Sequence, residues 1–226
     1  MGYEWDFSVV FGNFDLLLLG LVNTLKVTGL ALFFGIPLGL VLALMRLYGN
    51  KALRWPAGFI IEFLRSTPPI AQLFWFFFAL PILLGVEIDP FSASVLTFSL
   101  QSSAFFAEVF RGGIQSIDNG QWEAAKAIGM TRNATLQRII LPQAVKRMIS
   151  AFLERAIELM KTTTLVSTIS YSDLLYQANT IAQSSYRTLE VYTTAAAMYF
   201  IVILACSLLV GRLEHRLGRS GEITRG

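Results

Sequence analysis

The sequence predicts an all-α integral membrane protein that forms a single domain over residues 1–226 and crosses the bilayer five times. Hydrophobic residues make up 54% of the chain and charged residues 15%, and the mean hydropathy is +0.58. Soluble domains carry about 25% charged residues, and surplus apolar surface of this extent is stable where lipid replaces water. In a soluble protein, the 18 phenylalanines would form exposed apolar patches that cause aggregation.

Five segments are long and apolar enough to be transmembrane helices, because crossing the hydrocarbon core takes roughly 20 residues. The first, third and fifth contain long uncharged stretches, the second is rich in phenylalanine, and the fourth carries charges within its span. We predict these helices at about residues 14–45, 57–84, 90–111, 143–166 and 191–211.

Lysine and arginine alternate between the connecting segments, and this bias sets the orientation of membrane helices. The N-terminal segment and the predicted second and fourth loops are poor in basic residues. The first loop, the third loop and the C-terminal tail are rich in them. These basic residues are Arg46, Lys51 and Arg54, then Lys126, Arg132, Arg138, Lys146 and Arg147, then Arg212, Arg216, Arg219 and Arg225. We therefore expect a periplasmic N-terminus and a cytoplasmic C-terminus.

The composition argues against catalysis in this chain. There is one cysteine, Cys206, in an apolar run and one histidine, His215, in the basic tail, too few for a Cys/His metal site or a His-based triad. The chain also lacks a G-x-x-x-x-G-K-[ST] phosphate-binding loop, so nucleotide would have to bind to another chain. A membrane-embedded enzyme is therefore disfavoured, while a self-sufficient channel or secondary transporter stays open as an alternative.

The third loop, about residues 112–142, contains residues that typically begin and end two short helices. Asp118 or Asn119 can cap a first helix over residues 121–128, and Gly129 stands where a left-handed residue would end it. Thr131 can cap a second helix, which we expect to end at Leu141, before Pro142. The alanines of the first helix leave its backbone open to a partner's groove.

The spacing of this loop resembles the EAA signature of ATP-binding-cassette (ABC) importer permeases. The resemblance implies the type I importer permease fold and a coupling helix held by an ATPase subunit, with ATP and Mg bound by that partner and no cofactor in this chain. The matching residues are Glu123, Ala124, Ala125, Gly129, Ile139, Leu141 and Pro142.

Two further segments resemble the polar amino acid branch of these permeases, the histidine, glutamine, glutamate and arginine type. Residues 65–73 are similar to its R-G-T-P-x-x-x-Q motif with Ser66 in place of glycine, and residues 161–167 to its K-x-T-S-L-x-S segment with Thr164 in place of serine. The resemblance implies a bacterial inner-membrane importer with two ATPase subunits, a second permease, identical or paralogous, and a periplasmic or lipid-anchored binding protein. It implies no nucleic acid partner. An opine or compatible solute remains an alternative substrate.

Charged residues within predicted spans are costly in lipid and mark candidate functional positions. Glu154, Glu158 and Lys161 are spaced to share one helix face. Such a face would line a solute path, with Glu158 binding the ammonium group and Lys161 or Arg65 the carboxylate of an amino acid. Structural ion pairs satisfy the same burial rule and remain the alternative. The full candidate set is Glu62, Arg65, Pro68, Gln72, Glu154, Glu158 and Lys161.

Overall fold

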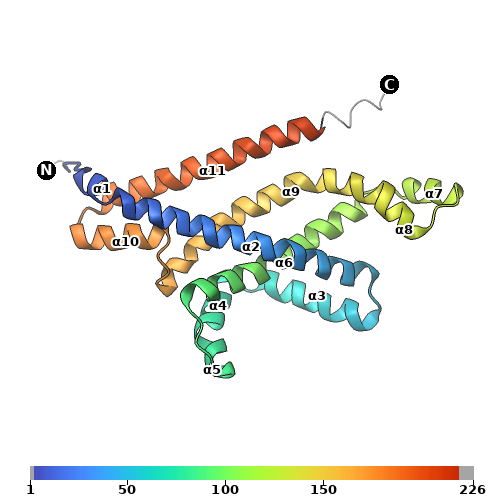
Figure 1. Cartoon of the computed structure of the whole chain (residues 1–226), viewed down its shortest axis with the longest axis horizontal. Coiled ribbons are helices and arrows are strands. Elements are labelled where there is room, and N and C mark those ends of the chain that lie inside the picture. The colour runs from blue at the N-terminus through green and yellow to red at the C-terminus, as the bar shows by residue number, and fades with distance from the viewer. Residues whose placement is uncertain (1–2, 219–226) are drawn as a thin grey trace.

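The computed structural model describes residues 3–218, and every regular element within that range is a helix. Four long helices run lengthwise through the molecule (Figure 1). The α7–α8 segment lies at one end and α1 and α10 lie at the other. The helices are α1 (Ser8–Gly12), α2 (Phe14–Tyr48), α3 (Lys51–Ser66), α4 (Pro69–Phe74), α5 (Leu80–Leu84), α6 (Pro90–Gln115), α7 (Asn119–Ala127), α8 (Arg132–Thr135), α9 (Leu141–Thr162), α10 (Leu174–Ser185) and α11 (Thr188–Gly218).

Within residues 3–218, three helices are long and apolar enough to cross a membrane alone, namely α2, α6 and the Thr188–Leu209 part of α11. A fourth crossing is formed if α3 and the helical segment Pro69–Leu84 count as one broken span, since they meet at 107°. The helix α9 does not meet the same measure, because six charged residues interrupt its apolar sequence. Three or four of the five predicted spans are therefore supported by length and composition. The tail residues Arg219 and Arg225 lie outside the described range.

The break predicted at Pro68 and Pro69 is present and sharp. Neither proline can donate a backbone hydrogen bond, and the backbone at Thr67 and Pro68 is extended before α4 begins. The Gln72 side chain closes the gap, since its Nε2 donates to the Leu64 carbonyl at 2.8 Å and to Thr67 Oγ1 at 2.6 Å. The glutamine thus satisfies a carbonyl that the helix break leaves without a partner.

Small residues let α2 and α6 approach closely. A Cβ atom placed on Gly39 would lie 2.7 Å from the Ser103 carbonyl oxygen and 2.8 Å from Phe106 Cβ, so only glycine fits there. Ser102 Oγ donates across the same interface to the Ala31 carbonyl at 3.3 Å. Small side chains and interhelical hydrogen bonds are the usual basis of helix association in lipid, where no hydrophobic force acts between helices.

The helix α10, which the sequence analysis treated as loop, covers the outer ends of α2 and α11. Its N-cap is Asp173, which accepts from the Tyr176 N–H at 2.8 Å and lies 3.4 Å from the Tyr199 hydroxyl. Burial raises the pKa of the Asp173 carboxyl from 3.8 to about 6. The apolar face of α10 packs into one cluster with α2 and α11, formed by Val10, Leu17, Leu174, Ala178, Ile181, Ala182, Val191, Ala195 and Met198.

The N-terminal segment is tied to the start of α11 through a fully buried carboxylate. Glu190 accepts from the Tyr3 hydroxyl at 2.6 Å and from the Asp6 N–H at 2.9 Å. Arg187 lies 3.6 Å from the same carboxylate and donates to the Glu4 carbonyl at 3.0 Å. These contacts join positions more than 180 residues apart in sequence.

The close contact at Gly39 gives a direct test of the packing between α2 and α6. Gly39→Ala should destabilise the purified protein by about 1–3 kcal/mol, because the added methyl group forces α2 and α6 apart. Gly29→Ala is the matched control in the same helix, since a Cβ there meets nothing within 4 Å. Thermal unfolding followed by size-exclusion chromatography in detergent measures both. Equal melting temperatures for the two variants would contradict the close approach.

Candidate functional site

The loop with the EAA-like spacing is a capped helix followed by a tight turn. The helix α7 begins at Asn119, and Asp118 Oδ1 accepts from the Gly120 N–H at 2.6 Å. Gly129 then adopts φ +78°, a left-handed conformation that other residues enter only with strain. Thr131 caps the next helix, as expected, by accepting from the Ala134 N–H.

The residues of the EAA-like pattern in and after α7 differ in exposure. Ala125 is 1% exposed and turns toward the bundle, whereas Glu123, Ala124 and Gly129 are exposed. Exposed small residues beside a carboxylate form a shallow surface that a partner protein can approach closely. This arrangement fits a helix that a partner protein grips from the outside.

The prediction that the second helix ends at Leu141 is wrong. The chain stays helical from α8 through a wider π-helical turn, Leu136–Ile140, into α9. Pro142 lies in the first turn of α9 and has no backbone N–H to donate. The wider π-helical turn before it accommodates this missing hydrogen bond. Ile140 is fully buried, while Ile139 is half-buried and Leu141 and Pro142 are exposed. The helix α6 continues to Gln115, into the predicted 112–142 loop.

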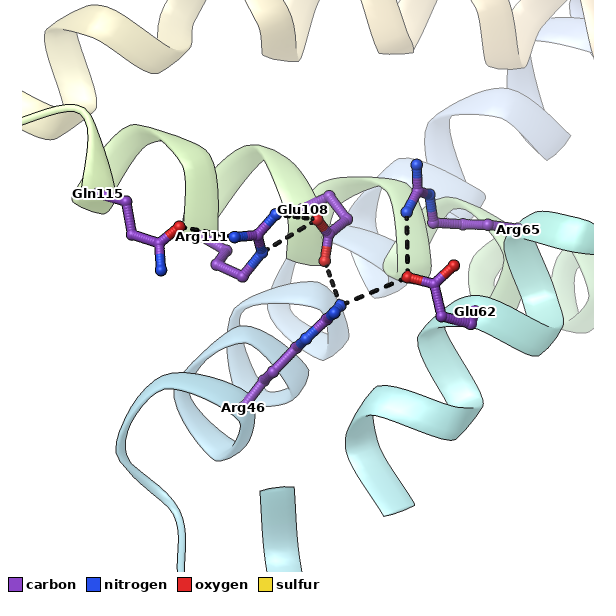
Figure 2. A network of polar contacts seen from close by, with 6 residues as sticks. All are labelled: Arg46, Glu62, Arg65, Glu108, Arg111 and Gln115. Carbon is purple, nitrogen blue, oxygen red and sulfur yellow. Dashed lines mark hydrogen bonds and ion pairs between the residues drawn. The ribbon is translucent and has the colours of Figure 1, made fainter. Parts of the chain in front are cut away.

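A network of charged side chains joins α2, α3 and α6 next to this loop (Figure 2). Arg46 of α2 lies 2.5 Å from Glu108 of α6 and 3.7 Å from Glu62 of α3. Glu108 also pairs with Arg111 at 2.6 Å, and Glu62 pairs with Arg65 at 3.5 Å. Arg46, which the sequence analysis assigned to a loop, is therefore the residue that connects the three helices.

On the charged face of α9, Glu158 pairs with Arg155 of the same helix at 2.5 Å. Glu154, Glu158 and Lys161 are all exposed on the single chain. Among the described side chains, neither Glu154 nor Lys161 has an oppositely charged group within 4.0 Å. The face is therefore open to a cavity or to another subunit, as a charged face in lipid requires.

A small cavity of about 80 Å³ lies where α4, α6 and α9 meet. The ring of Phe105 separates it from the charged network, with Arg155 at 4.9 Å and Arg65 at 5.8 Å from the ring centroid. Among the predicted candidates, only Glu158 lines the cavity. The other polar lining residues are Gln101, Ser102, Arg155 and Thr162.

Sequence reasoning missed most of these polar lining residues, although one signal was available. Gln101, Ser102 and Ser103 form a polar run within an otherwise apolar predicted span. Such a run favours an interior face of the helix. Gln72 and Pro68, in contrast, lie in the helix break described above, where Gln72 Oε1 has no hydrogen-bond partner among the described residues.

Together the fold and the site define a helical membrane subunit that exposes the short helix α7 at one end, and its sequence contains no G-x-x-x-x-G-K-[ST] loop. Residues 35–219 match the family described as binding-protein-dependent transport system inner membrane component. The chain belongs to this family. It is a multi-pass inner-membrane permease of an ABC importer, in which ATPase activity resides in partner subunits.

Relatives and solved structures agree with this assignment. The chain is 38% identical over 222 residues to the glutamate/aspartate import permease protein GltK of Escherichia coli, covering 95% of this chain and 99% of GltK. It is 34% identical over 212 residues to the arginine transport system permease protein ArtQ of Bacillus subtilis, covering 94% and 97%. A crystal structure of an amino acid ABC transporter with histidines superposes with a TM-score of 0.90 at 36% identity, covering 95% of this chain and 100% of that one.

The ion-pair network predicts non-additive stability. Replacing either Arg46 or Glu108 with glutamine removes the nearer of the helix-bridging partners of a partly buried charge, and we expect each change to destabilise the protein by about 1–3 kcal/mol. The double variant Arg46→Gln/Glu108→Gln should cost less than the sum of the two single changes. Thermal unfolding of all four proteins measures the coupling. Strictly additive losses would show that the pair contributes nothing beyond its separate side chains.

Proposed function

We propose that this chain carries polar amino acids inward across the cytoplasmic membrane as one permease of a four-subunit translocating core. The observation that supports the substrate class most directly is the set of full-length relatives named for glutamate/aspartate, glutamine and arginine transport. The solved amino acid transporter with the same fold supports it independently. An opine or a compatible solute is the alternative cargo within the same class.

The proposed topology has five spans, with α9 as the fourth, a periplasmic N-terminus and a cytoplasmic C-terminus. The charges of α9 support this assignment because Glu154, Glu158 and Lys161 lie on one face with Arg155 beside them, which leaves the opposite face between Met148 and Thr162 uncharged. That face would look toward the second permease, identical or paralogous, across the solute path. The strongly basic segments around α7 and after α2 would then face the cytoplasm.

The proposed coupling segment is the 112–142 region, gripped by one of two ATPase subunits that bind ATP and Mg. Its exposed Glu123 and Ala124 would contact the ATPase, and Gly129 would fix the turn behind them. The buried Ala125 and the half-buried Ile139 would seat the segment against the bundle, and the exposed Leu141 and Pro142 would begin α9 directly after it. A periplasmic or lipid-anchored binding protein would deliver the solute at the opposite end.

The proposed solute path follows the open face of α9 and the cavity at Phe105. The Arg155–Glu158 pair has the two charges that a zwitterion needs, so an amino acid can exchange with it, its carboxylate on Arg155 and its ammonium on Glu158. Lys161, Glu154, Glu62 and Arg65 would extend the polar path along α9 and α3. Pro68 and Gln72 would shape it through the helix break.

Coupling is tested by uptake into proteoliposomes that contain the full complex with its ATPases and binding protein. Glu123→Lys and Gly129→Val should each lower ATP-dependent uptake at least about tenfold, because either change weakens binding of the segment to the ATPase subunit by more than about 1.4 kcal/mol. Gln137→Lys, an exposed position outside the motif, is the control. Normal uptake by the first two variants, or uptake without any ATPase subunit, would overturn the coupling proposal and favour a self-sufficient transporter.

The solute path is tested by two carboxylates on the same helix. Glu158→Gln should raise the half-saturating substrate concentration about tenfold through loss of one charge-assisted hydrogen bond. Glu154→Gln, on the same face but outside the cavity, should raise it by much less. Uptake is measured with a panel of labelled glutamate, glutamine, arginine and a compatible solute. If both variants behave alike, or both fail to assemble, the charges serve the bundle and not the solute.

A further inference from the structure

A cavity of about 530 Å³, much larger than the one at Phe105, lies between the end of α2, the helix α7, and α8 with the residue that follows it. It is separate from both the ion-pair network and the candidate solute path. Its lining divides into an apolar part and a part with hydrogen-bond donors. The apolar residues are Leu44, Leu47 and Leu136, and the donors include Tyr48, Trp122 and Arg132.

The cavity carries positive charge that no described side chain neutralises. The Arg132 guanidinium lies over the Tyr48 ring at 5.5 Å from its centroid. Among the side chains that the structure describes, Arg132 has no carboxylate within 4.0 Å, whereas Arg46, Arg65, Arg111 and Arg155 all pair with one. The lining contains neither aspartate nor glutamate. An anion would therefore enter without repulsion from the wall.

Three donors at this cavity are unused by the protein. Across the described part of the chain, the Tyr48 hydroxyl, the Trp122 indole N–H and the Arg132 guanidinium form no hydrogen bond to another residue. A tetrahedral oxyanion such as a phosphate group accepts several such donors at once. The chemistry of the cavity thus fits a phosphate-bearing ligand.

The position of the cavity indicates where that phosphate comes from. Tyr48 lies three residues beyond the predicted first span, residues 14–45, which would place the cavity at the depth where hydrocarbon gives way to headgroups. Tyrosine and tryptophan prefer this zone, and basic pockets at the cytoplasmic side suit anionic headgroups. Leu44, Leu47 and Leu136 continue the wall with apolar surface, which a free phosphate would not need.

We propose that this cavity binds one anionic phospholipid. Its phosphate would contact Arg132, Trp122 and Tyr48, and an acyl chain would lie along the three leucines. Assignment to the cytoplasmic leaflet rests on the proposed topology. The bound lipid would join the end of α2 to α7, so it would hold α7 against the membrane-spanning helices and make coupled ATP hydrolysis depend on anionic lipid.

The full complex with its ATPases, purified in mild detergent, tests the binding. Native mass spectrometry would count phosphatidylglycerol retained per permease, with phosphatidylcholine as the neutral probe and excess inorganic phosphate as competitor. Arg132→Gln should lower retention of phosphatidylglycerol about tenfold, as loss of one charge-assisted contact predicts. Arg138→Gln is the matched control, since Arg138 is exposed nearby but does not line the cavity.

Reconstitution in vesicles gives a second readout, the ratio of binding-protein-stimulated ATPase activity in phosphatidylglycerol to that in phosphatidylcholine. This ratio should exceed one for the original protein and for Arg138→Gln, and fall to one for Arg132→Gln. Tyr48→Phe, which removes only the hydroxyl, should lower it in part and serves if Arg132→Gln does not assemble. Equal lipid retention by both arginine variants, or displacement of the lipid by inorganic phosphate, would overturn the proposal. Failure of uptake in every lipid would instead count against the proposed function.

Discussion

The close contact between α2 and α6 positions the rest of the molecule. Glycine on one helix and serine on the other bring the two backbones together, so the helix that carries Arg46 is held beside the helix that carries Glu108. The same α6 lines the cavity with Gln101 and Ser102 on its way to the loop that carries α7. A shift between α2 and α6 would therefore disturb the ion-pair network and the helix α7 together. Lipid offers no hydrophobic force to restore such a shift.

Long-range patterning made much of the fold predictable, while local backbone irregularities did not follow from it. Uncharged runs placed α2, α6 and α11, and consecutive prolines placed the break in the second span. The 107° angle at that break depends on Gln72, which closes the gap from eight residues away. The π-helical turn before Pro142 and the short helix α10 were missed, because tertiary packing stabilises both against weak local propensity.

The sequence predicted the capping and turn residues of the site well, but it predicted less well which charged residues form ion pairs. The capped helix, the left-handed Gly129 and the Thr131 cap follow from local chemistry, which a sequence states directly. Partner choice among charges depends on which helices are neighbours. Hence Glu62 and Glu108 share Arg46, a residue taken for part of a loop, and Glu158 pairs with Arg155. Only the three-dimensional arrangement decides between such alternatives.

The buried Glu190 has a consequence for the order in which the chain assembles during synthesis. Its carboxylate is satisfied by Tyr3 and by the backbone of Asp6, which leave the ribosome long before α11 does. The N-terminal residues therefore lack these contacts while the intervening helices are synthesised and inserted. Once α11 is inserted, the Glu190 carboxylate binds the N-terminal segment, so the last contacts of the bundle join the two ends of the chain.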